Sequence, residues 1–123
     1  MTPRRGEIWW LRQTPRERQA TDASVWRRPY LVVSSDAWNA VPEYPRVTVS
    51  PLTGAQHVTR RYDTDVVLRR KETHLPKDSV VRCTEVYTVF RDVLLERIAR
   101  VSDARMAEVD RALMLYLALV KVE

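Results

Sequence analysis

Apolar residues occur along the chain in short segments that alternate with polar turns. Several of these segments are rich in β-branched and aromatic residues and are bounded by glycine, proline or asparagine, a pattern typical of β-strands. The predicted strands cover residues 7–11, 30–35, 46–50, 64–68, 79–89 and 94–99. Polar turns and loops connect them, and a basic run at 69–71 is either a solvated face or a surface that follows a phosphate backbone.

The period of the pattern changes near the C-terminus, where a helix is predicted. Ser102 is a favourable N-cap, and Asp103 places a negative charge in the first turn, where it complements the helix dipole. Apolar residues then recur at helical spacing, at Met106, Val109, Leu113, Tyr116, Leu117 and Val120. Residues 112–120 are apolar almost all round, so we expect this segment to bury surface against a partner chain.

Several short strands followed by one helix predict a mainly β fold with a C-terminal helix. We expect a small barrel rather than a parallel α/β sheet. A length of 123 residues suits one domain, which we assign to residues 1–123.

The stretch at 26–35 combines an arginine with a buried strand. Pro29 lacks a backbone N–H, so we expect it to open the strand rather than lie within it. The apolar run 31–33 is of the kind that is buried on both faces. An arginine at the mouth of such a strand is partly preorganised, and its planar fork suits phosphate recognition. The alternative for Arg28 is a solvated loop charge.

Two further segments lie beside predicted strand ends. Residues 12–27 form a long polar loop that is rich in arginine, and we expect it to cover or line a site. Thr53 follows the predicted strand 46–50, and its hydroxyl can donate to a phosphate oxygen. The alternative for Thr53 is a residue that caps a turn.

Charge adds a pointer to the partner. The chain has 21 Lys and Arg residues against 16 Asp and Glu residues and a sequence pI of about 9.8, which favours a polyanionic partner. Positive charge is concentrated in residues 1–28, which hold seven arginines and three acidic residues.

No segment approaches the ~20 apolar residues of a membrane span. We also expect no secretory signal, and one cysteine, Cys83, fits a reducing cytoplasm.

The sequence contains no motif for a metal site or for a nucleotide-binding loop. No cluster of His, Cys, Asp and Glu has metal-ligand spacing, and with only Gly6 and Gly54 there is no glycine-rich phosphate loop. We therefore expect neither a metal nor another cofactor. His57 and His74 lie in polar loops as surface residues or, alternatively, as an acid/base pair. What remains is Arg28 and Thr53 at neighbouring strand ends, an arrangement that suits stabilisation of charge at a phosphodiester.

Five segments in this order and spacing resemble the MazF/PemK toxins of toxin–antitoxin systems. They are RGEIW (5–9), RPYLVVS (28–34), VTVSPLT (47–53), LPKDSVV (75–81) and the tail 97–119 with MAEVD. The resemblance implies a homodimeric, SH3-like barrel of the MazF/PemK/CcdB type that cleaves single-stranded RNA without a metal. It also implies a cognate antitoxin peptide whose acidic C-terminal segment neutralises the toxin.

The resemblance assigns catalytic roles to Arg28 and Thr53. Attack of a ribose 2′-OH on the adjacent phosphorus would leave a 2′,3′-cyclic phosphate and a 5′-OH. The loop 16–27 lacks the family's glycine, so neither Glu17 nor Asp22 is assigned as the base. An Asp-Gln pair, a basic residue and Thr or Ser, typical of the family, are replaced by TEVYT at 84–88, so no RNA sequence preference is carried over.

Four more residues are predicted to line the RNA groove: Trp26 by stacking on a base, and Arg27, Arg60 and Arg61 by phosphate contact. Trp26 packed under its own loop is the alternative. Two other functions compete with cleavage: a non-catalytic, CcdB-like toxin that binds DNA gyrase, and an RNA-binding barrel that cuts nothing. The pair Arg28 and Thr53 favours the nuclease, because a gyrase inhibitor has no need of it.

Overall fold

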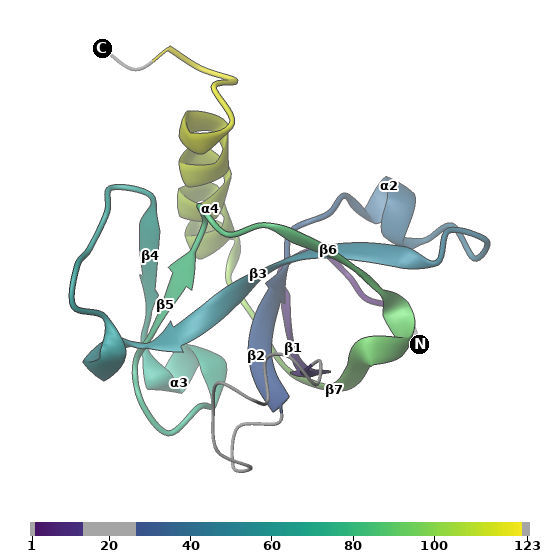
Figure 1. Cartoon of the computed structure of the whole chain (residues 1–123), viewed down its shortest axis with the longest axis horizontal. Coiled ribbons are helices and arrows are strands. Elements are labelled where there is room, and N and C mark those ends of the chain that lie inside the picture. Colours follow the sequence, from purple (N-terminus) through teal and green to yellow (C-terminus); the bar gives the residue numbers. More distant parts are fainter. Residues whose placement is uncertain (1, 14–26, 122–123) are drawn as a thin grey trace.

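The computed structural model describes residues 2–13 and 27–121 (Figure 1). In these residues an antiparallel sheet has the strand order β4-β5-β3-β2-β1-β7, and β6 pairs with β3. The strands are β1 (Glu7–Arg12), β2 (Arg27–Val32), β3 (Arg46–Gly54), β4 (Asp65–Leu68), β5 (Ser79–Arg82), β6 (Tyr87–Phe90) and β7 (Leu94–Arg100). The helices are α2 (Asp36–Asn39), α3 (Arg70–Thr73) and α4 (Asp103–Tyr116), with 3₁₀ turns η2 (Ala55–His57) and η3 (Arg91–Val93). The prediction of a mainly β fold with a C-terminal helix is confirmed.

Strand β3 crosses the middle of the molecule and exchanges partners on one edge (Figure 1). Its first residues pair with β6, ending at Val49 opposite Tyr87, and its last residues pair with β5, starting at Leu52 opposite Val81. The opposite edge of β3 pairs with β2. This exchange bends the sheet into the curled form expected of a small barrel.

The predicted position of Pro29 was wrong, and β3 continues beyond residue 50, where the predicted strand ended. Pro29 lies within β2, opposite Trp10, and Pro51 lies within β3, which continues to Gly54. Both positions tolerate a missing N–H. Pairing of β2 with β3 begins only at Tyr30, and Pro51 lies where β3 has left β6 and not yet joined β5. A proline there removes no ladder bond on that edge.

Other element boundaries also differ from the prediction. The predicted strand 79–89 is divided into β5 and β6 by a turn in which the Glu85 N–H donates to the Arg82 carbonyl at 3.0 Å. The division lets the chain pass from one half of β3 to the other. The predicted strand 30–35 ends at Val32, and short helices α2 and α3 occupy segments predicted as a turn and a basic run.

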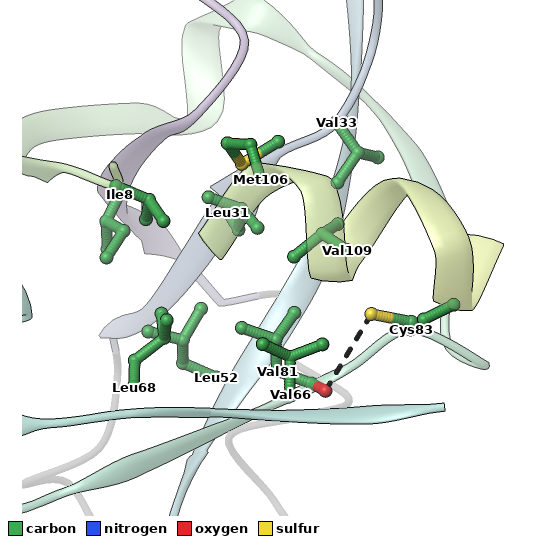
Figure 2. Close-up of a cluster of buried hydrophobic side chains, with 12 residues drawn as sticks. Ile8, Leu31, Val33, Leu52, Val66, Leu68, Val81, Cys83, Met106 and Val109 are labelled. Carbon is green, nitrogen blue, oxygen red and sulfur yellow. Dashed lines mark hydrogen bonds between the residues drawn. The ribbon is translucent and has the colours of Figure 1, made fainter. Parts of the chain in front are cut away.

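Alternation of side chains along the strands builds two buried clusters. Neighbouring residues enter opposite clusters, so that Leu31 packs in the first and Tyr30 and Val32 pack in the second. Figure 2 shows the first cluster, in which Met106 and Val109 of α4 lie over side chains of the sheet. Leu31 is fully buried, a burial worth about 1.5–3 kcal/mol. The prediction that the run 31–33 is buried on both faces is confirmed.

The second cluster lies on the other face of the strands. Its members are Trp9, Leu11, Tyr30, Val32, Val47, Val49 and Leu94.

Helix α4 begins and ends with defined caps. The Ser102 Oγ accepts from the Arg105 N–H at 3.2 Å, as predicted for an N-cap. The helix ends at Tyr116, earlier than the apolar stripe indicated. There the Ala118 N–H donates to Leu115 and the Leu119 N–H donates to Met114, the paired bonds of a Schellman motif. Ala118 adopts the left-handed conformation with φ 59°, a position that favours glycine.

We predict that Ala118→Gly raises the free energy of unfolding by about 0.5–1 kcal/mol, because relief of left-handed strain exceeds the extra entropy of the unfolded glycine. Ala107→Gly is the matched control: Ala107 is exposed within α4, where glycine costs about 1 kcal/mol. Urea denaturation of both variants at one protein concentration measures the two changes. A loss of stability in Ala118→Gly would contradict the prediction.

Candidate active site

Arg28 and Thr53 face each other across β2 and β3. The paired segment ends with Tyr30 opposite Pro51. Continuing the same register two residues past this end brings Arg28 level with Thr53, and their side chains meet there. The Arg28 Nη2 donates to the Thr53 Oγ1 at 2.7 Å. Both side chains are half-buried, so they meet at the surface of the sheet. The two residues predicted from separate strand ends are therefore brought into direct contact.

The Arg28 guanidinium also lies against an aromatic ring. Its Cζ is 5.8 Å from the centroid of the Tyr30 ring, which is almost fully buried. Arg28 and Tyr30 are two residues apart on β2, so both project from the face that carries the second cluster. A cation–π contact of this kind restricts the guanidinium and leaves its N–H groups free to bind an anion.

The charge on Arg28 has no carboxylate partner among residues 2–13 and 27–121. Arg5, Arg69, Arg82, Arg97 and Arg105, in contrast, each lie within ion-pair distance of an acidic side chain. Because the Thr53 oxygen accepts from Arg28, the hydroxyl hydrogen of Thr53 remains available to donate. The pair therefore presents a positive charge and several N–H and O–H donors, a combination that suits a phosphate group.

Tyr87 lies near Arg28 and is bonded to Glu85, and neither residue was predicted as part of the site. The Tyr87 hydroxyl donates to the Glu85 Oε1 at 3.1 Å. Burial raises the pKa of the Tyr87 hydroxyl, and the Glu85 carboxylate adds to the rise, whereas the nearby Arg28 lowers it. The sequence could have indicated that Tyr30 lies near Arg28, because the two residues are two positions apart on one strand. It could not have indicated that Tyr87 lies near Arg28, because this depends on the pairing of β6 with β3.

The other predicted RNA-binding residues lie apart from the pair. Arg27 belongs to the opposite face of β2 from Arg28, where its guanidinium is 4.5 Å from the Trp10 ring centroid. The Arg60 guanidinium is 5.3 Å from the Tyr62 ring centroid, and Arg61 is exposed. Trp26, Glu17 and Asp22 lie outside the described residues.

The remaining chemical groups are placed as follows. His57 and His74 are exposed, and neither contributes a hydrogen bond to the Arg28–Thr53 pair within the described residues. Cys83 is buried within the first cluster (Figure 2), and burial raises the pKa of its thiol to about 12. Over residues 2–13 and 27–121, no three His, Cys, Asp or Glu side chains are grouped as metal ligands. No described helix is both long and apolar enough to span a membrane.

Comparisons with known proteins extend over nearly the whole chain. The chain is 34% identical over 111 residues to the probable endoribonuclease MazF5 of Mycobacterium tuberculosis, which covers 90% of this chain and 89% of that protein. The structure of the present chain is similar to that of an endoribonuclease in complex with its cognate antitoxin from Mycobacterial species, with a TM-score of 0.73 and 23% identity. This similarity covers 98% of the present chain and 99% of the other chain.

A MazE–MazF crystal structure from Deinococcus radiodurans is also similar. It has a TM-score of 0.68 and 26% identity, with 96% of this chain and 98% of that chain covered. These similarities confirm the predicted barrel of the MazF/PemK type. Residues 4–117 match the family model for PemK-like and MazF-like toxins. The chain therefore belongs to the PemK-like, MazF-like toxins of type II toxin–antitoxin systems.

Proposed function

We propose that this protein is a sequence-selective endoribonuclease toxin that cleaves single-stranded RNA without a metal ion. The observation that carries the proposal is the Arg28–Thr53 hydrogen bond of 2.7 Å at the surface of the sheet. The positive charge of Arg28 has no carboxylate partner in the described residues. The similarity to the MazF5 protein, which is named a probable endoribonuclease, supports RNA cleavage over gyrase inhibition.

The proposed reaction is an internal transfer of the phosphodiester. The ribose 2′-oxygen forms a bond to the adjacent phosphorus while the bond from phosphorus to the 5′-oxygen breaks. One proton leaves the 2′-OH, and one is added to the departing 5′-oxygen, which gives a 2′,3′-cyclic phosphate and a 5′-OH. The Arg28 guanidinium stabilises the extra negative charge of the phosphorane, and the Thr53 hydroxyl donates to a non-bridging oxygen.

The RNA strand extends from the cleavage pair over the basic surface. We propose that Arg27, Arg60 and Arg61, all exposed, contact phosphates, and that Trp26 stacks on a base. The rings beside Arg27 and Arg60 hold these guanidinium groups in place by cation–π contact.

We propose that two copies of the chain form a homodimer and that a cognate antitoxin regulates it in the cytoplasm. Tyr116, Leu117 and Leu119, at the end of α4, are 51%, 53% and 70% exposed, which leaves apolar surface for a second copy. An acidic antitoxin segment fits the basic surface near Arg28, where carboxylates would occupy the place of phosphates. The match to toxins of type II toxin–antitoxin systems supports an antitoxin partner.

Cleavage is tested directly by incubating the purified protein with total RNA in EDTA and mapping the new 5′ ends. We expect 5′-OH ends at a shared sequence. Arg28→Ala should lower the rate by on the order of 10²-fold or more, because one preorganised charge donor is lost. Thr53→Ala should lower it less. Arg28→Lys should restore only part of the activity, because an ammonium lacks the fork.

Arg46→Ala is the matched control for Arg28→Ala. Arg46 is exposed and lies 4.9 Å from the Phe90 ring centroid, so this variant removes an equal charge and a similar cation–π contact elsewhere. Its activity should stay near that of the unchanged protein. If folded Arg28→Ala protein cleaves RNA at the rate of the Arg46→Ala control, the assignment of Arg28 is wrong.

The groove prediction concerns the salt dependence of RNA binding. Replacing Arg60 and Arg61 with glutamine should weaken binding and reduce the slope of log K against log salt by about 1.4, which corresponds to two lost phosphate contacts with a single strand. Arg100→Gln with Arg111→Gln removes the same charge at other exposed positions and should change the slope less. Equal slopes in the two double variants would remove Arg60 and Arg61 from the groove.

Assembly is tested by sedimentation velocity at micromolar protein concentration. We expect a species of twice the mass of one chain, and Leu117→Asp should shift it toward monomer because an exposed apolar contact gains a charge.

The antitoxin site is tested by competition: an acidic antitoxin peptide should displace labelled RNA from the dimer. A monomer for the unchanged protein contradicts the dimer, and simultaneous binding of peptide and RNA contradicts the proposed antitoxin site.

A further inference from the structure

A pocket of about 330 Å³ lies beside the Arg28–Thr53 pair. Its wall is formed by the end of β1, by β2, by Val86 and the strand β6 that follows it, and by η3. The apolar part consists of Leu11, Val86, Val89 and Val93. This apolar wall suits a flat, uncharged group better than a phosphate.

Two tyrosines complete the pocket on the side of Arg28. Tyr30 is almost fully buried and carries the Arg28 guanidinium over its ring, while Tyr87 is 45% exposed. Arg12 also lines the pocket and is exposed. The pocket therefore has an aromatic wall that continues directly into the charged group assigned to the scissile phosphate.

The position of Tyr87 follows from the pairing of β6 with β3. Tyr87 lies opposite Val49 and Val89 lies opposite Val47, so both belong to the face that carries the second cluster. The hydrogen bond from Tyr87 to Glu85 restricts the ring.

We propose that this pocket binds one nucleobase next to the scissile phosphate, that Tyr87 stacks on this base, and that the shape of the pocket, of which Tyr87 forms one wall, selects it. The inference rests on the proposed RNA cleavage at Arg28. A single-stranded RNA exposes its bases, and aromatic side chains bind them by stacking. With the phosphate at Arg28, the neighbouring base reaches the tyrosine side of the same site. Tyr87 acts in this proposal as a specificity-determining residue rather than as an acid or a base.

The test compares Tyr87→Ala, Tyr87→Phe and Phe90→Ala with the unchanged protein. Phe90 is a matched control because it is an exposed aromatic residue on the same strand, opposite Arg46. Each protein is used to select bound sequences from a randomised pool of single-stranded 2′-O-methyl RNA, which has no free 2′-OH to attack. Cleavage of an unmodified pool is mapped in parallel.

We expect Tyr87→Ala to lose the base preference at one position beside the scissile phosphate and to cleave the preferred sequence about tenfold more slowly. Tyr87→Phe keeps the ring and should keep the preference, and Phe90→Ala should do the same. Folded Tyr87→Ala protein with an unchanged preference in both pools overturns the proposal. If the unchanged protein cleaves nothing but shows a preference in the uncleavable pool that Tyr87→Ala loses, the pocket stands and the nuclease function fails.

Discussion

The antiparallel pairing of β2 with β3 is the constraint on which the rest of the structure depends. Because side chains alternate, this register decides in one step which residues enter the cluster under α4 and which face the other side. It also places Arg28 opposite Thr53. A slip of one residue would turn Arg28 toward the helix and move Leu31 from the first cluster to the second, so the same apolar packing that stabilises the fold fixes the geometry of the site.

Electrostatics distinguish Arg28 from most other arginines that touch the sheet. Arg82 pairs at 2.9 Å with Asp65, whose side chain is fully buried, and Arg97 pairs at 3.1 Å with the buried Glu7. Such pairs satisfy charges that burial would otherwise penalise. Arg28 instead combines a hydroxyl and an aromatic ring, neither of which neutralises it. Among the described residues, no carboxylate cancels the positive charge of Arg28, which favours an external anion.

Much of the fold could be predicted from the sequence because its signals are local. Alternation located most of the strands, and the N-cap at Ser102 located the start of α4. The strand boundaries near Pro29 and Pro51 were predicted wrongly, because local propensity does not show where a strand lacks a partner on one edge and so tolerates a proline. Arg28 and Thr53 could be named from their strand ends and from the family resemblance. Tyr87 could not, because its position depends on long-range pairing of β6.

The exchange of partners along β3 separates the strand that fixes Thr53 from the strand that carries Tyr87. Thr53 is held by the ladder with β5, whereas Tyr87 is carried by β6, which pairs only with the first half of β3 in the described residues. Side chains on β6 can therefore change without altering the hydrogen bonds that fix Thr53. Under the roles proposed for Tyr87 and Thr53, substitutions on β6 can alter the choice of base while the hydrogen-bonded position of the catalytic threonine on β3 stays the same.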